Sequence, residues 1–288
     1  MLRLELGDSS VVVAPETGGA VLGWLYRGTP VLRRATPEAV LDGNVRMFGA
    51  FPLLPFCNRI AHGRFTWEGR SYQLDRNFGD HPHSIHGVGW QQQWEVAATA
   101  DASVSLMLDY AGDARHWPFS FRAGLEYRLS EHGCQVTFYL TNCHSDPAPA
   151  GIGLHPYFPR AAGQTLRFDA GGVWLNDADS LPLQHNAVPA DWEHRAPRPV
   201  GSVVLDNCFT GWSRRARIAG VAGGLTIEAD AAFRHLQVFT PAGKDFFCVE
   251  AVSHVADALN RKELAADQAM HVLQPGETLS GSITFTLA

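Results

Sequence analysis

Apolar residues alternate with polar ones along most of this 288-residue chain, and this period of two is the feature that most constrains its fold. Residues 65–74, FTWEGRSYQL, carry large apolar or aromatic side chains at every second position on both sides of a Glu68-Gly69 turn. Such alternation is typical of half-buried strands, and the short turn between the two runs predicts a β-hairpin.

The same pattern recurs from one end of the chain to the other. In residues 94–110, Trp94, Val96 and Ala98 alternate before a second apolar run, and residues 123–140 repeat the arrangement around a turn. We expect each of these segments to form a hairpin with one face in the core. Further strands are predicted in residues 2–6, 224–240 and 277–288.

Helical patterns are scarce by comparison. Residues 36–43, TPEAVLDG, fit one or two helical turns, and residues 255–270 contain good helix formers but are interrupted by Asn260. The 28 glycines and 17 prolines are spread evenly, as turns are, and no linker, repeat or low-complexity tract is present. We therefore predict an all-β protein, with residues 1–288 forming a single domain of two large packed antiparallel sheets and few short helices.

Composition excludes several classes of function. The net charge of −6 provides no basic surface of the kind that nucleic-acid binding requires. No run of 18 apolar residues is present, so no transmembrane helix is predicted. The first ten residues, MLRLELGDSS, are too short and too polar for a signal peptide. The expectation is a cytoplasmic protein with neither a nucleic-acid nor a membrane partner.

The five cysteines are an odd number and include no Cys-x-x-Cys pair, which disfavours a disulfide framework or a zinc knuckle. We expect them to be buried and reduced. The cysteines are Cys57, Cys134, Cys143, Cys208 and Cys248.

An Asn-Arg pair interrupts an otherwise apolar segment, FCNRIAHGRF, at residues 56–65. A charge such as that of Arg59 is costly in a packed interior unless another group pairs with it. The position of Asn58 and Arg59 therefore indicates either an ion pair or a polar ligand.

Glu250 and His155 also stand beside apolar residues. Glu250 follows the buried-looking run FFCV, where desolvation would raise its pKa and suit it to act as a base, although alternation also permits a surface position. His155 precedes Pro156, which favours an extended backbone, and its imidazole could serve as an acid, a base or a hydrogen-bonded core residue.

Two further segments carry reactive side chains. DHPHSIHG contains His81, His83 and His86, but it is loop-like and has no second cluster at metal-ligand spacing, so we expect no metal there. Asp206 in LDNCF fits a turn as well as a site. Taken one at a time, these residues specify no function.

Taken in chain order, the motifs Asn-Arg-Ile, His-Gly, His-Pro-Tyr-Phe, Asp-x-x-Phe and Val-Glu resemble those of the aldose 1-epimerase (galactose mutarotase) family, in its compact bacterial branch. The resemblance runs from about Asn58 to Glu250. It implies a galactose mutarotase-like β-supersandwich and an isomerase that interconverts the α and β anomers of a free aldose through the open-chain aldehyde.

The resemblance also implies residue roles. His155 would be the general acid that protonates the ring oxygen, and Glu250 the general base that takes the proton from the C1 hydroxyl. His86 would hydrogen-bond the sugar near the reacting centre. The implied substrate-binding residues are Arg59 and Asp206, with Asn58 supporting Arg59 or touching the sugar, and Phe239 stacking on the sugar face.

This chemistry needs no metal, nucleotide or covalent nucleophile, in agreement with the lack of a G-x-G-x-x-G motif or a P-loop. The expected partner is a monosaccharide, and the expected state a monomer or homodimer. Two motifs depart from the family pattern: Val88 interrupts His-Gly-Gly, and Ala251 replaces the proline that often follows the base. Both departures bear on substrate preference rather than on the reaction. His254, four residues after Glu250, could add to the site.

Three rival functions remain open. A sugar phosphate or other modified sugar would need extra basic residues near the pocket, for which Arg64, Arg160, Arg214 and Arg215 are available. A non-catalytic sugar-binding protein would need neither Glu250 nor His155. A glycoside hydrolase would need two carboxylates across the bond, and would leave His155 idle.

Overall fold

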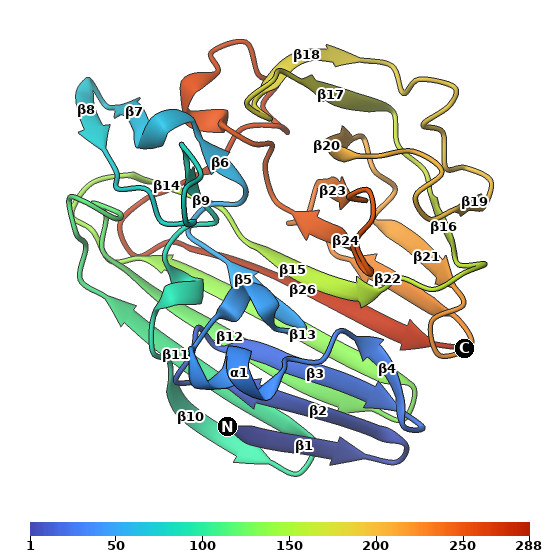
Figure 1. The fold of residues 1–288 in the computed structure, drawn as a ribbon. Helices are drawn as coiled ribbons and strands as arrows, with labels where there is room; N and C mark the ends of the chain where they lie inside the picture. The colour runs from blue at the N-terminus through green and yellow to red at the C-terminus, as the bar shows by residue number, and fades with distance from the viewer.

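The computed structural model describes all 288 residues and contains 26 β-strands, one α-helix and four 3₁₀ helices (Figure 1). The strands of the first half are β1 (Leu2–Leu6), β2 (Ser9–Ala14), β3 (Ala20–Tyr26), β4 (Thr29–Leu32), β5 (Ala50–Leu53), β6 (Arg59–Ile60), β7 (Arg64–Trp67), β8 (Arg70–Gln73), β9 (Ser84–Ile85), β10 (Glu95–Ala100), β11 (Ser103–Tyr110), β12 (Phe121–Ser130) and β13 (Gly133–Asn142). Those of the second half are β14 (Ala148–Ala150), β15 (Gly153–Pro159), β16 (Thr165–Phe168), β17 (Gly172–Asn176), β18 (Pro182–Asn186), β19 (Arg198–Pro199), β20 (Asp206–Thr210), β21 (Arg215–Ala219), β22 (Leu225–Ala229), β23 (His235–Phe239), β24 (Phe246–Val252), β25 (His271–Leu273) and β26 (Thr278–Leu287).

Two large sheets account for most of these strands. An 11-stranded sheet has the order β1-β2-β3-β5-β15-β24-β23-β20-β17-β18, with β4 paired to β3. A nine-stranded sheet has the order β10-β11-β12-β13-β26-β22-β21-β16-β19. The named strands pair antiparallel throughout both sheets, so the predicted all-β fold with two large antiparallel sheets is confirmed.

The core lies between the two sheets. Trp24 of β3 meets Phe285 of β26 edge to face at 6.2 Å, and the buried hydroxyl of Tyr127 in β12 donates to the carbonyl of Gly19 at 2.8 Å. These contacts join one sheet to the other within a cluster of 59 buried apolar residues. The packing explains why single faces of the strands are apolar, since each sheet buries its inner face against the other.

Each predicted hairpin is present. The β7–β8 hairpin turns at Glu68-Gly69, and β12 pairs with β13 without a register break over ten residue pairs. The expected inward face of residues 94–98 is wrong in part, because Val96 and Ala98 are exposed whereas Trp94 is buried. Their strand, β10, is the edge of its sheet and shifts register between these two residues, which releases it from the core.

The helices are short, as predicted. Helix α1 (Pro37–Leu41) begins at Thr36, whose side chain accepts a hydrogen bond from the Ala39 amide. The segment 255–270 contains only the 3₁₀ helix Ala258–Asn260. The other 3₁₀ helices are Val45–Met47, Ala61–Gly63 and Gly89–Gln91. None of these helices is long and apolar enough to cross a membrane.

The cysteines are all free thiols, and four of the five are buried as expected. The exception is Cys143, which is exposed just after the end of β13.

Candidate active site

Two neighbouring strands at the centre of the 11-stranded sheet carry the predicted acid–base residues. Strand β15 lies between β5 and β24, with His155 opposite Phe51 of β5. Six of the seven residues of each strand are buried, so neither strand has a wet face. Polar side chains on such strands lie inside the protein and need partners there.

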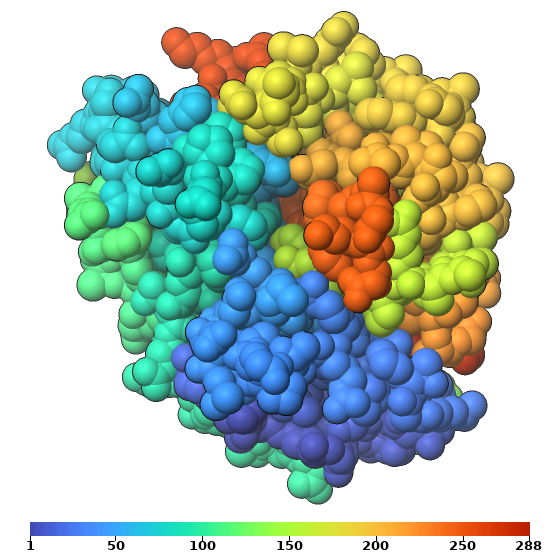
Figure 2. All heavy atoms as spheres, in the orientation of Figure 1, coloured from blue at the N-terminus to red at the C-terminus, as the bar shows by residue number.

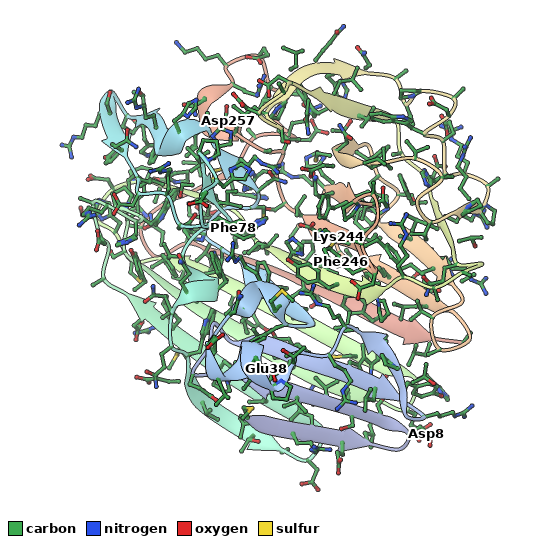
Figure 3. The ribbon with its side chains drawn as sticks, viewed as in Figure 1. Asp8, Glu38, Phe78, Lys244, Phe246 and Asp257 are labelled. Atoms are coloured by element: carbon green, nitrogen blue, oxygen red, sulfur yellow. The ribbon has the colours of Figure 1, made fainter.

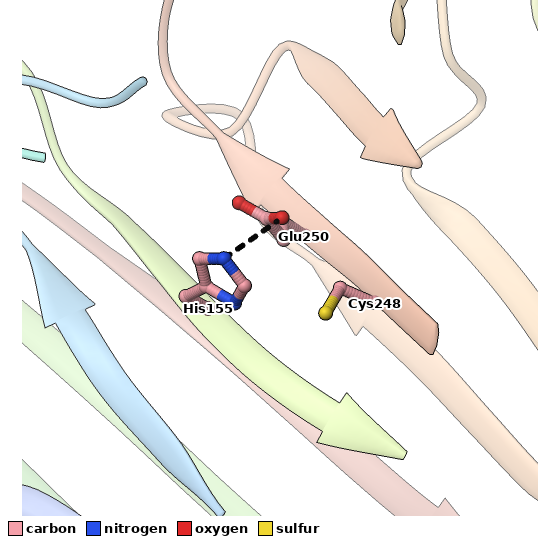
Figure 4. Close-up of side chains that lie close together, drawn as sticks. All are labelled: His155, Cys248 and Glu250. Atoms are coloured by element: carbon pink, nitrogen blue, oxygen red, sulfur yellow. Dashed lines mark ion pairs between the residues drawn. The ribbon is translucent and has the colours of Figure 1, made fainter. Parts of the chain in front are cut away.

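His155 and Glu250 are partners of each other. The Nε2 atom of His155 lies 3.5 Å from Oε1 of Glu250, and only 8% and 3% of the two side chains are exposed (Figure 4). The alternative of a surface glutamate is therefore wrong. The residues from Phe247 to Val252 are all buried, so both faces of this strand are covered and period-two alternation does not apply to it.

Burial moves the pKa values of the pair in opposite directions. Desolvation, reinforced by the charge of Asp206, raises the pKa of Glu250 well above its usual range, while Arg59 opposes the rise. Desolvation and the charge of Arg33 lower the pKa of His155 to about 3. Burial therefore favours the uncharged form of each group, a protonated carboxyl at Glu250 and a neutral imidazole at His155.

Aromatic rings hold the His155 imidazole in place. It stacks between Phe51, with ring centroids 4.8 Å apart, and Tyr157, with centroids 4.5 Å apart. Its Nδ1 atom is buried and has no hydrogen-bond partner. The ring orientation is thus set by packing, and Nε2 is the nitrogen directed toward Glu250.

Two hydrogen bonds hold Asn58 and His86 together. The amide of Asn58 donates to Nδ1 of His86 at 3.1 Å, and the amide of His86 donates to the carbonyl of Asn58 at 2.8 Å. Since Nδ1 accepts, the neutral ring carries its proton on Nε2, as a donor available to the pocket. Gly87 permits this turn, because a Cβ there would lie 2.1 Å from the Leu54 carbonyl oxygen.

Arg59 is the centre of a charged hydrogen-bond network. Its two terminal nitrogens donate to Oδ1 of Asn58 at 3.0 Å and to Oδ2 of Asp206 at 2.9 Å. Gln237 donates to the other oxygen of Asp206 at 2.8 Å. The interior charge of Arg59 is therefore paired, and Asp206 is a partner of Arg59 rather than only a turn residue.

These side chains line one cavity of about 340 Å³, a size suited to a small molecule. Figure 2 shows the corresponding hollow, bordered by blue, cyan and orange segments that are far apart in the sequence. All seven predicted site residues line it, including Phe239, which follows Val238 at the end of β23. They are Asn58, Arg59, His86, His155, Asp206, Phe239 and Glu250.

Part of the cavity lining carries no recognisable sequence signal. The basic residues Arg33 and Arg46 face the same cavity, although neither belongs to a motif that could have revealed it. The four arginines considered for a phosphate do not line it. The remaining lining residues are Asn44, Met47, Phe78, His81, Ile85, Tyr157 and Phe246.

Two histidine expectations change. His254 does not line the cavity; its Nε2 accepts from the Cys57 amide and its Nδ1 contacts the Val255 carbonyl, so it supports the backbone just before Asn58. His83 also has both ring nitrogens engaged with backbone groups, whereas its neighbour His81 reaches the cavity.

The closest approach to a metal-binding group is the buried set of His155, Cys248 and Glu250, whose potential ligand atoms lie within 4.8 Å of one another (Figure 4). Burial and the nearby Glu250 raise the pKa of the Cys248 thiol well above its usual range. This environment favours a neutral thiol beside the pair.

Comparison with known proteins identifies the family. A family model described as aldose 1-epimerase matches residues 1–286. The Escherichia coli K12 protein YphB, described as uncharacterized, is 30% identical over 293 residues, covering 98% of this chain and 94% of YphB. The aldose 1-epimerase of the same organism is 24% identical over 161 residues, covering 54% of this chain and 44% of that enzyme.

Solved structures show the same architecture. A candidate aldose 1-epimerase of Escherichia coli K12 superimposes with a TM-score of 0.87 at 28% identity, covering 99% of this chain and 97% of that one. A galactose mutarotase-like protein of Clostridium acetobutylicum gives a TM-score of 0.86 at 20% identity, covering 98% and 93%. With the family model spanning nearly the whole sequence, this chain belongs to the aldose 1-epimerase family.

Proposed function

We propose that the protein is an aldose 1-epimerase that interconverts the anomers of a monosaccharide by acid–base ring opening and closure. The observation that carries this proposal is the buried His155–Glu250 pair, 3.5 Å apart, at a cavity whose other polar groups suit sugar hydroxyls. An acid and a base side by side, with pKa values moved in opposite directions, suit a reaction that needs both at once.

In the proposed reaction, Glu250 takes the proton of the C1 hydroxyl while His155 delivers a proton to the ring oxygen. The O–H electron pair forms the C1 carbonyl, and the bond between C1 and the ring oxygen breaks. Rotation about the C1–C2 bond presents the other face of the aldehyde. The ring oxygen then attacks C1, and both proton transfers run in reverse.

The pair needs one proton in total, and its environment supports this state. With His155 neutral and Glu250 protonated, a proton transfer across the 3.5 Å contact gives the imidazolium–carboxylate form that begins the reaction. Arg59 favours the carboxylate of this form because its charge opposes the rise in the Glu250 pKa. A hydroxyl that donates to the carboxylate would favour it further.

The surrounding groups can position the sugar. Arg59 and Asp206 offer charged donors and acceptors held in place by Asn58 and Gln237. His86 offers its Nε2 proton, and Phe239 offers an apolar surface. A glycoside hydrolase is less well supported, because both Asp206 oxygens already accept hydrogen bonds and Asp206 is not free to act as an acid.

The test is mutarotation of freshly dissolved α-D-galactose and α-D-glucose, followed by polarimetry with and without the protein. We expect Glu250→Gln and His155→Asn each to lower the catalysed rate by roughly 10²- to 10⁴-fold. The matched control is Glu228→Gln, a side chain exposed on β22 that lies outside the cavity, and it should retain the rate.

A folded wild type that binds aldoses without accelerating anomer exchange would contradict the proposal and support a sugar-binding protein. So would retention of the rate by both active-site variants. Circular dichroism and thermal melting of each variant separate loss of chemistry from loss of fold.

A further inference from the structure

Two arginines of the cavity hydrogen-bond to neither His155 nor Glu250. Arg33 and Arg46 both line it, both are partly exposed, and neither has a carboxylate within ion-pair distance. The Arg33 guanidinium donates from Nε and Nη2 to the carbonyls of Phe48 and Arg46, and its Nη1 donates to no carbonyl or carboxylate. The Arg46 guanidinium donates to no protein group.

Each arginine lies one aromatic ring away from an active-site histidine. The Cζ atom of Arg33 is 3.8 Å from the centre of Tyr157, which stacks on His155. The Cζ atom of Arg46 is 5.0 Å from the centre of Phe78, which meets His86 edge to face at 5.7 Å. The aromatic rings therefore set the distance between the reacting centre and both cations.

Phe78, which Arg46 contacts, and Phe246, a second ring that Arg33 contacts, lie on different sides of the hollow. Phe78 is in a loop between β8 and β9, while Phe246, which Arg33 contacts at 5.0 Å, begins β24 (Figure 3). The Nη2 atom of Arg33 donates to the backbone carbonyl of Arg46, so the two residues are adjacent in the cavity wall. Both side chains are partly exposed and line the cavity.

The charge balance of the cavity leaves these two cations uncompensated. Asp206 pairs with Arg59, and the His155–Glu250 pair is neutral overall when it shares one proton. Asp245 attracts Arg33 but lies beyond ion-pair distance. Guanidinium groups with free N–H donors and no acidic partner are suited to bind a carboxylate or phosphate in two-point geometry.

We propose that the substrate is an aldose with an anionic group at the end remote from its anomeric carbon, held by Arg33 and Arg46. This inference rests on the proposed epimerase function and narrows its substrate class. A phosphate ester and a uronic acid carboxylate share the required chemistry. The anomeric end would reach His155 and Glu250, and the anion would lie beyond the Tyr157 and Phe78 rings.

The experiment measures exchange between anomeric protons by two-dimensional NMR for glucose, glucose 6-phosphate and glucuronate. At low ionic strength we expect kcat/KM for at least one anionic sugar to exceed that for glucose at least about 10-fold. Added salt should reduce this preference, because it screens the partly exposed arginines. The phosphate and carboxylate arms identify which anion is bound.

The variants Arg46→Gln and Arg33→Gln test the assignment of the site. Each should lower the ratio of kcat/KM for the preferred anionic sugar to that for glucose by about 10-fold. Arg64→Gln, outside the cavity, is the matched control and should leave the ratio unchanged. Because the readout is a ratio, partial loss of folded protein in any variant does not alter it.

The results distinguish two kinds of failure. If glucose is epimerised but neither anionic sugar is preferred, or if the arginine variants leave the ratio unchanged, the anionic substrate class is overturned and the epimerase function stands. If the folded protein epimerises none of the three sugars and does not epimerise galactose either, the proposed function fails and the inference fails with it.

Discussion

The β12–β13 hairpin and the β15–β24 pair are both antiparallel, yet they differ in how far their polar residues are buried. Along β12, buried residues alternate with exposed or partly exposed ones, so the strand has one dry face and one wetter face. Along β15 and β24, six consecutive residues of seven are buried. The first region builds the core, whereas the second carries reactive groups into it.

The comparison shows where burial has a functional consequence. Charged residues of β12 lie on its solvent side, as Arg122 does in its exposed pair with Asp109. His155 and Glu250 are buried side by side, and desolvation moves their pKa values in opposite directions. Stability and chemistry should therefore respond to different residues, which substitutions in the two regions can test.

The largest effect on stability should come from the hairpin core. Phe138 of β13 is fully buried and meets Phe233 at 5.8 Å. We expect Phe138→Ala to lower the free energy of unfolding by about 3–5 kcal/mol, through lost burial and the cavity left behind. Denaturant titration measures this loss, while KM of the remaining folded protein should not change.

The matched control is Tyr139→Ala, one residue along the same strand, where the side chain is 44% exposed. A loss of stability comparable to that of Phe138→Ala would show that the two faces of β13 do not differ as their burial indicates.

A smaller, functional effect should follow from Arg59→Lys. A lysine keeps the charge but cannot bridge Asn58 and Asp206 with a planar fork. Loss of one charge-assisted hydrogen bond, about 1.5–3 kcal/mol, predicts a fall in kcat/KM of roughly 10- to 100-fold. Steady-state kinetics on the preferred sugar test this, with Arg64→Lys as a control outside the cavity.

Glu250→Gln should stabilise the protein although it removes activity. Above pH 4.5 the unfolded chain releases the Glu250 proton while the native state retains it, so native stability falls as pH rises toward the raised native pKa. Glutamine has no proton to release. At neutral pH we therefore expect Glu250→Gln to be more stable than the wild type.

Thermal melting across a pH series is the measurement for this variant. The difference in Tm between Glu250→Gln and the wild type should grow as pH rises above about 4.5 and should vanish below it. A variant that is less stable than the wild type at neutral pH would mean that the buried carboxyl stabilises the fold.

The smallest effect is expected on the wet face of the hairpin. Arg122 of β12 and Asp109 of β11 form an exposed ion pair, with more than half of each side chain accessible. Exposed pairs of this kind are screened and contribute little to stability. Arg122→Ala should therefore leave Tm within measurement error, and a clear drop would contradict this view of the face.

Half-buried strands account for most of what could be predicted from the sequence. The hairpins at residues 64–73, 95–110 and 121–142 follow from alternation and turns, because each strand has one face in water. Edge strand β10 departs from prediction at Val96 and Ala98, since exposure at a sheet edge depends on neighbours that the local pattern does not specify.

The sequence by itself determined the all-β class, the motif residues and the need for a partner at Arg59. Only the tertiary structure decided that Glu250 is buried against His155, that Asp206 is the partner of Arg59, and that Arg33 and Arg46 enter the same cavity. The reason is physical. The alternation of apolar and polar residues reflects which face of one strand contacts water, whereas a pocket is made by side chains from strands and loops that are distant in the chain. Desolvation and pairing depend on those distant neighbours.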